Sequence, residues 1–88
     1  MIQSTSLEAF YSIIGELGQR QQEIFNAIQK YKSVSNLDLS RLLQLPINSV
    51  TPRVKELRDK GLVVCNGYKI DRITNRRMKT WRVVNETE

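Results

Sequence analysis

Apolar side chains recur every three or four residues through the first two thirds of the chain, which predicts a series of amphipathic helices. We expect these helices over about 6–16, 20–32, 37–43 and 48–60. The apolar face of the first helix consists of Leu7, Phe10, Tyr11, Ile14 and Leu17. The predicted inward positions of the other three helices are Ile24, Phe25, Ile28 and Tyr31, then Leu39, Leu42 and Leu43, and finally Val50, Val54 and Leu57.

Polar residues, glycine and proline indicate where the later helices begin and end. Asn36 is a predicted cap of the third helix, and Asn48 or Ser49 of the fourth. With either cap, Pro52 falls in or just beyond the first turn, where few backbone amides have intrahelical partners. Gly61 is the expected C-terminal cap of the fourth helix.

The pattern changes to that of strands after Gly61. The β-branched stretch 62–65 predicts a strand, which could continue to Ile70 with a bulge at Gly67. A polar tip follows over 71–77, and 79–84 is the expected return strand, with Trp81 and Val83 facing the core. Residues 33–35 are extended enough for a short strand before the third helix.

Helix, helix, short strand, helix, turn, helix and hairpin is the element order of a winged helix-turn-helix, a mainly α fold with a small β-hairpin wing. We expect 1–18 to be an N-terminal helical extension, 19–84 to be the winged domain, and 85–88 to be a disordered tail. Thr5 and Glu8 have the spacing of a capping box at the start of the extension. Its apolar face either covers the core or pairs with a second copy as a homodimer.

Charge adds a functional indication, because the net charge of +5 is unevenly placed. Residues 1–48 hold equal numbers of basic and acidic residues, whereas residues 49–84 hold ten basic and three acidic ones. Clustering of this kind is typical of a protein that binds nucleic acid. Duplex DNA is therefore the expected partner. The ten basic residues are Arg53, Lys55, Arg58, Lys60, Lys69, Arg72, Arg76, Arg77, Lys79 and Arg82.

Catalytic and metal chemistry find little support in the composition. The chain has no histidine and a single cysteine, Cys65, which we interpret as a buried strand residue. A structural zinc site needs about four Cys or His ligands. The acids Glu56, Asp59 and Asp71 lack the clustering of a two-metal nuclease. We expect no enzyme activity, metal or cofactor. Because no membrane span or signal peptide is visible, we expect a cytoplasmic protein.

The fourth helix is the candidate recognition helix, over about 48–60. Its exposed N-terminal half can offer Arg to guanine, Asn to adenine, Glu to cytosine and a Thr methyl to thymine. Lys55 and Arg58 are the candidates for phosphate contacts alone, which position the domain without specifying sequence. The candidate DNA-binding residues here are Asn48, Ser49, Thr51, Pro52, Arg53, Lys55, Glu56 and Arg58.

The hairpin is the candidate wing, over about 66–79, and it crowds five basic residues against Asp71. Such charges also guard an edge strand against sheet pairing, but the excess here is greater than that role requires. Arg76 and Arg77 could lie along phosphates or enter the minor groove. The candidate DNA-binding residues of the wing are Lys69, Arg72, Asn75, Arg76, Arg77 and Lys79.

Two segments of the chain add to these indications. They are Leu-Gln-Leu-Pro-Ile-Asn-Ser-Val-Thr-Pro-Arg-Val-Lys-Glu-Leu-Arg-Asp-Lys-Gly-Leu-Val at 43–63 and Thr-Asn-Arg-Arg-Met-Lys-Thr-Trp-Arg-Val at 74–83. Together with the leader 6–13, they resemble small winged helix-turn-helix proteins of bacteriophages and bacterial mobile elements. The resemblance implies DNA binding through residues 48–58 and the 69–79 wing.

Members of that group often have Thr-Gly-Arg at the wing tip, and here Asn75 replaces the glycine. Asparagine tolerates a left-handed backbone better than most residues. A transcriptional regulator or accessory factor is the expected role. The alternative is a winged-helix interaction module whose basic face binds an acidic partner protein.

Overall fold

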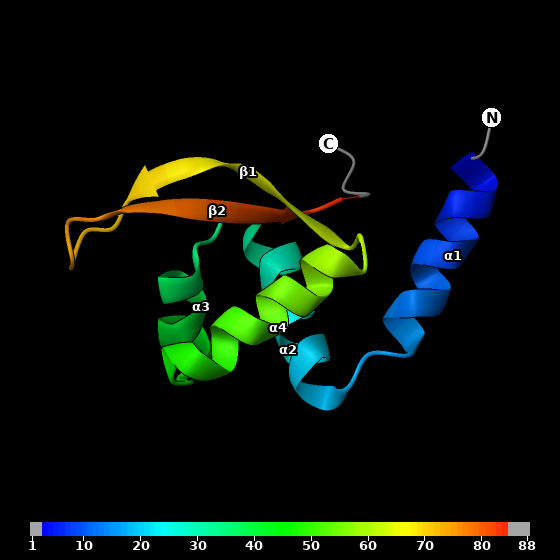
Figure 1. The fold of residues 1–88 in the computed structure, drawn as a ribbon, viewed down its shortest axis with the longest axis horizontal. Coiled ribbons are helices and arrows are strands. Elements are labelled where there is room, and N and C mark those ends of the chain that lie inside the picture. Colours follow the sequence, from blue (N-terminus) through cyan, green and yellow to red (C-terminus); the bar gives the residue numbers. More distant parts are fainter. Residues whose placement is uncertain (1–2, 85–88) are drawn as a thin grey trace.

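The computed structural model describes residues 3–84, with side chains from residue 8 onward. Four helices precede a two-stranded antiparallel hairpin (Figure 1), which confirms the predicted fold class. The elements are α1 (Gln3–Gly15), α2 (Gln19–Tyr31), α3 (Asn36–Leu43), α4 (Ile47–Asp59), β1 (Val63–Ile70) and β2 (Arg77–Val83).

The core lies where α2, α3 and α4 pack beneath the base of the hairpin (Figure 1). The predicted stripe of α4 is buried, and so are Trp81 and Val83 of β2. Val34 pairs with Trp81 as an isolated β-bridge, which confirms the short extended piece before α3. Two inward predictions are wrong, because Tyr31 and Leu42 are 47% and 45% exposed. Both lie in the last turn of a helix, where the chain runs past the edge of the core.

Helix α1 stands to one side of the other helices (Figure 1). It begins at Gln3, so the predicted cap at Thr5 is wrong and that residue lies inside the helix. The ring of Phe10 is buried with its centroid 6.3 Å from that of Phe25, so α1 covers part of the core. Tyr11 is 63% exposed and does not take part in that contact. The predicted tail at 85–88 lies outside the described residues.

Ser35 caps helix α3. The prediction that Asn36 is the cap is therefore wrong, because Asn36 is the first residue of the helix. The Ser35 hydroxyl accepts a hydrogen bond from the Asp38 amide at 3.1 Å, and the Asp38 carboxylate accepts one from the Ser35 amide at 3.0 Å. This reciprocal pair satisfies two donors at the helix start. The Asn36 side chain is therefore free for contacts outside the helix.

Helix α4 begins at Ile47, one residue earlier than predicted. Pro46 occupies the cap position, and no side chain forms a capping hydrogen bond. Neither Asn48 nor Ser49 is the cap, and Pro52 lies in the second turn. Proline there leaves the carbonyl of the residue four positions earlier, Asn48, without its helical partner. Asn48 and Pro52 are both exposed, so water can hydrate that carbonyl.

Gly61 ends α4 as predicted. The φ of Gly61 is 78°, which turns the chain back on the end of the helix. The Gly61 amide then donates to the Arg58 carbonyl at 2.9 Å, and the Leu62 amide donates to the Leu57 carbonyl at 3.0 Å. We expect Gly61→Ala to lower the free energy of unfolding by about 1–2 kcal/mol, because a Cβ disfavours this conformation. Gly15→Ala is the matched control in urea denaturation, since Gly15 ends α1 without a positive φ and has open space around it. Equal effects of the two substitutions would contradict this explanation.

The first strand of the hairpin continues through the predicted bulge to Ile70, so the longer of its two possible lengths is confirmed. The register shifts between Cys65 and Gly67, and the Thr80 hydroxyl lies 2.6 Å from the Asn66 amide oxygen. The return strand starts at Arg77, two residues earlier than predicted. Cys65 is exposed, so its predicted burial is wrong. It lies on the outer strand of the hairpin directly beside the bulge, where no helix covers it.

Candidate nucleic-acid interface

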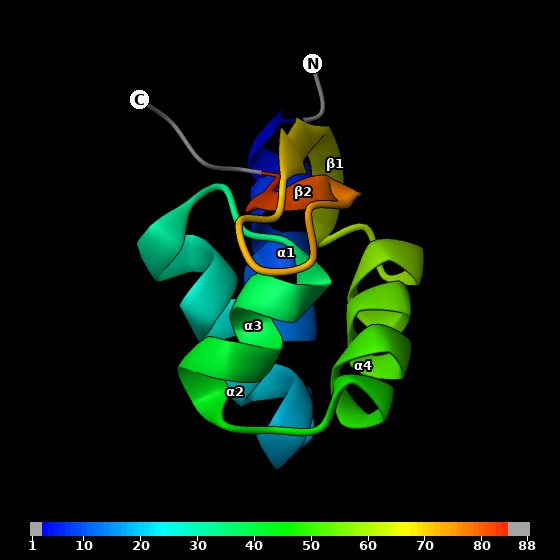
Figure 2. The same ribbon diagram turned by 90° about the vertical axis from the view of Figure 1, so that its left-hand side faces the viewer.

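The N-terminus of α3, the first turns of α4 and the tip of the hairpin lie at the same end of the molecule (Figure 2). On α4, the predicted DNA-binding residues divide into two groups according to their exposure. The half-buried group lies on the side nearer α2. The exposed residues are Asn48, Thr51, Pro52, Lys55 and Arg58, and the half-buried ones are Ser49, Arg53 and Glu56.

Arg53 is held by a neighbour on its own helix. Its Nε and Nη2 atoms donate to the two carboxylate oxygens of Glu56 at 2.8 and 2.9 Å. The Gln21 amide of α2 donates to the same carboxylate at 2.8 Å. The bonds from Arg53 and then Gln21 hold the pKa of Glu56 below its usual value. Glu56 thus fixes the guanidinium, whose Nη1 donors stay available for an acceptor outside the protein.

Lys55 and Arg58 have different surroundings. Lys55 pairs with Asp59 at 3.1 Å, but both side chains are about two thirds exposed, so the pair contributes only about 0.3–0.5 kcal/mol. The guanidinium of Arg58 lies 5.0 Å from the centre of the Trp81 ring. Arg58 is therefore on the side of α4 that faces the hairpin, and Lys55 is free to reach solvent.

Asp71 anchors the tip of the hairpin. It is 1% exposed and accepts two hydrogen bonds from the Arg41 guanidinium of α3, at 2.7 and 3.0 Å. It also accepts from the amides of Ile73 and Thr74 and from the Thr74 hydroxyl. The Arg41 bonds, followed by those of Thr74, hold the pKa of Asp71 far below its usual range. The tip is thereby fixed to the helix-turn-helix.

Lys69 forms a second connection between the hairpin and α3, since its ammonium group pairs with Asp38 at 2.5 Å. Burial raises the pKa of Asp38, but its bonds to Lys69 and Ser35 outweigh that effect and leave the pKa lowered. Lys69, predicted as a DNA-binding residue, therefore has its charge offset within the protein.

Four other basic residues of the hairpin are exposed, and within residues 3–84 none of them forms an ion pair. The guanidinium of Arg77 lies 4.5 Å from the centre of the Tyr68 ring, which holds it against the outer face of the hairpin. We call these four residues the wing cations: Arg72, Arg76, Arg77 and Lys79.

Asn75 adopts a left-handed backbone conformation, with φ of 64°, which asparagine tolerates better than most residues. Its amide donates to the Asp71 carbonyl at 2.8 Å, and the Asp71 amide donates to the Arg76 carbonyl at 2.7 Å. These two hydrogen bonds close the turn at the tip, so the main role of Asn75 is to allow the backbone conformation of that turn.

Two residues near the interface are missing from the sequence prediction, Arg41 and Asn36. Arg41 is one of few cations in the neutral half of the chain, and no pattern indicates its partner. Asn36 accepts a hydrogen bond from Trp81 Nε1 at 2.9 Å and donates to Thr51 Oγ1 at 3.4 Å. Asn36 therefore links the hairpin to α4, a role that its predicted place at the start of a helix does not indicate.

A family model described as winged helix-turn-helix DNA-binding matches residues 17–64, more than half of the chain. The chain belongs to this family. The winged helix-turn-helix is accordingly a DNA-binding domain, as its basic half predicted, with α3 and α4 as its two helices and the hairpin as its wing. No individually curated protein matches the chain significantly. Over residues 3–84, none of the helices has the length and apolar character needed to cross a membrane.

Proposed function

We propose that this winged helix-turn-helix binds duplex DNA sequence-specifically, with α4 in the major groove and the wing on the adjacent backbone or minor groove. The observation that carries this proposal is the fixed wing tip. Because Asp71 joins it to Arg41 of α3, the wing cations stay at a set position beside α4. A fixed cationic surface next to an exposed helix face suits a rigid duplex and requires little ordering on binding.

The exposed first turns of α4 supply the base contacts in this proposal. Asn48 and Thr51 are available for adenine and thymine edges, and Pro52 adds an apolar contact. Ser49 and Glu56 support the neighbouring part of the helix. Lys55 and Arg58 contact phosphates, as do the wing cations and, in part, Lys69.

Arg53 is the proposed guanine reader. Since Glu56 holds its guanidinium in one orientation, we expect Arg53→Ala to weaken a selected site by about 1–3 kcal/mol and random duplex much less. Lys55→Ala is the control, because loss of a phosphate contact weakens both duplexes alike. Fluorescence anisotropy on the two duplexes measures both effects. If Arg53→Ala lowers both affinities equally, Arg53 does not read a base.

The role in the cell belongs to the same proposal. By its resemblance to phage and mobile-element proteins, the chain acts as a transcriptional regulator or accessory factor without enzymatic activity, in the cytoplasm of a bacterial host. Residues 1–18 form an extension to the domain at 19–84. The exposed Tyr11 on α1 is available for pairing with a second copy. Such a homodimer would bind two half-sites about one helical turn apart.

Selection of bound duplexes from a random pool tests the proposal. The expected result is a single consensus, in which one half-site indicates a monomer on DNA and two indicate a dimer. The absence of any enriched sequence would contradict sequence-specific binding. A stoichiometric acidic protein captured from the host, together with no retention on DNA-cellulose, would favour the interaction-module alternative.

A further inference from the structure

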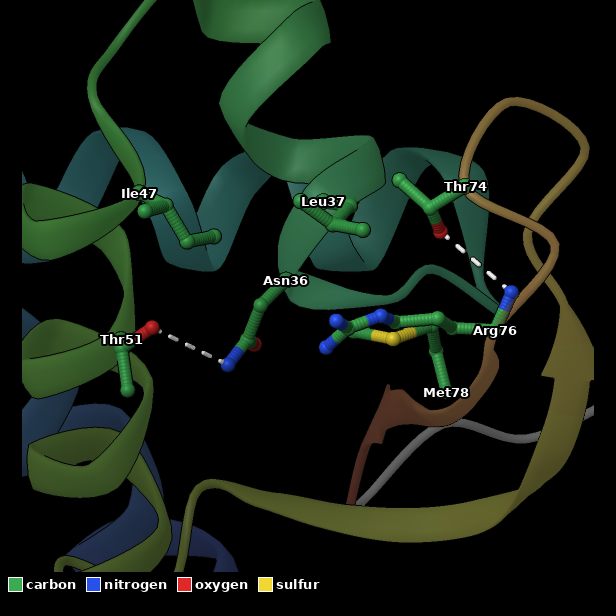
Figure 3. Close-up of a pocket in the computed structure, with 7 residues that line it drawn as sticks. All are labelled: Asn36, Leu37, Ile47, Thr51, Thr74, Arg76 and Met78. Carbon is green, nitrogen blue, oxygen red and sulfur yellow. Dashed lines mark hydrogen bonds between the residues drawn. The ribbon is translucent and has the colours of Figure 1, made fainter.

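A groove of about 520 Å³ lies between the three parts of the interface (Figure 3). We propose that it seats one sugar–phosphate unit of the DNA backbone, with Asn36 as a DNA-binding residue alongside Thr51 and Arg76. This inference rests on the proposed function and adds a site to it. The groove is lined by Asn36 and Leu37 of α3, Ile47 and Thr51 of α4, and Thr74, Arg76 and Met78 of the wing.

Three of the four polar side chains of the groove present donors, whereas the hydroxyl of the fourth, Thr74, donates to Asp71 at 3.0 Å. Indole nitrogen can only donate, so the oxygen of the Asn36 amide faces Trp81 and its NH₂ group faces the groove. One of those N–H bonds points to Thr51, whose hydroxyl accepts it at 3.4 Å and keeps its own proton to donate. Arg76 extends its guanidinium along Met78 toward Asn36 (Figure 3). Three donor groups around one space suit an anion with several oxygen acceptors.

The remaining walls are largely apolar, and no carboxylate is among the lining residues. Leu37, Ile47 and Met78 offer carbon surface that matches the carbons of a deoxyribose. A free inorganic ion would leave that surface unused, whereas a sugar joined to its phosphate covers both kinds of wall. The lining thus fits a nucleotide backbone better than a simple anion.

The position of the groove indicates that this backbone belongs to the bound duplex. A sugar–phosphate strand separates the major groove from the adjacent minor groove. With α4 in the first and the wing in the second, that strand has to pass between Thr51 and Arg76, which lie on opposite sides of the groove. Charge complementarity agrees, since Arg76 is the sole charged residue of the lining and is positive.

Asn36→Asp tests the inference with little risk to the fold. An aspartate at the start of α3 is favoured by the helix dipole, and its oxygen can still accept from Trp81. It places a negative charge where the phosphate should lie. Asn26→Asp on α2 is the matched control, because it changes the net charge equally at an exposed position outside the groove. We expect random-duplex affinity to fall at least about tenfold for Asn36→Asp and less than about twofold for Asn26→Asp at the same salt concentration.

The outcomes separate this inference from the proposed function. If the wild-type protein binds no duplex, the proposed function fails and the inference fails with it. If the wild type binds but the two variants weaken binding equally, the groove assignment alone is overturned. The single tryptophan gives one indole N–H signal in a nitrogen–proton NMR spectrum, and duplex binding should shift it through Asn36. Saturation of that shift by deoxyadenosine monophosphate at micromolar concentration, with displacement of duplex, would instead assign the groove to a free nucleotide.

Discussion

Asp71→Ala is expected to unfold at a temperature roughly 5 °C or more below the wild type and to bind duplex DNA more weakly. The substitution removes the acceptor of two bonds from Arg41 and of three bonds within the wing tip. It also leaves the Arg41 guanidinium without its partner. The wing tip then loses its fixed position beside α4. Calorimetry measures the first effect and anisotropy the second.

Asp59→Ala is the matched control for Asp71→Ala. Asp59 also pairs with a basic residue, Lys55, but its side chain is 66% exposed. We expect little change in stability, because exposed pairs contribute little. Similar melting temperatures for the two variants would contradict the anchoring role of Asp71.

Acid denaturation supplies a second readout for Asp71. Because its folded-state pKa is depressed, its contribution to stability is present above the unfolded pKa of about 3.9 and is lost as pH falls through the folded pKa. We therefore expect this contribution to stay constant between about pH 5 and 8 and to decrease below about pH 4. Asp71→Ala should lose stability less steeply in acid than the wild type does.

The double variant Arg76→Ala with Arg77→Ala has the largest expected effect on binding. Neither guanidinium is used in an ion pair within the described part of the chain, so both are available to phosphates or the minor groove. We expect affinity for all duplexes to fall by roughly tenfold or more, and the log–log salt slope to become shallower by about two. Filter binding over a salt series measures both quantities.

Removing two charges elsewhere controls for net charge in that experiment. Lys30→Ala with Lys60→Ala lowers the charge by the same amount, and both lysines lie in clefts away from the wing, beside α3 and α1 respectively. The salt slope should change little. An equal change in the two double variants would show that net charge, and not the wing, governs binding.

The fold was predictable because it depends on local and periodic signals. The stripe of Val50, Val54 and Leu57 needs one buried face, and Gly61 needs a left-handed cap. The start of α4 differs from the prediction because Asn48 and Ser49 are typical capping residues, whereas Pro46 precedes the helix and no side chain caps it. Pro52 lies two or three positions further into the helix than expected, and it is tolerated there because the carbonyl that loses its helical partner lies on an exposed face.

The candidate site was only partly predictable, because charge patterns do not reveal partners. Lys69 and Asp71 belong to the same basic segment, yet each pairs with a residue of α3 about thirty positions earlier. Sequence alone could not separate such structural charges from the wing cations. Nothing in the sequence indicates Asn36 for a similar reason, since its contacts with Trp81 and Thr51 form only once the hairpin packs over α3 and α4.

The salt dependence of duplex binding tests the central claim most directly. With about four to six phosphate contacts, the logarithm of the association constant should fall with the logarithm of salt concentration with a slope of about −4 to −5. Anisotropy of a labelled duplex, titrated from low to moderate salt, measures it. A steep linear decrease is the predicted result, and an affinity indifferent to salt, or no binding to any duplex, would contradict the account.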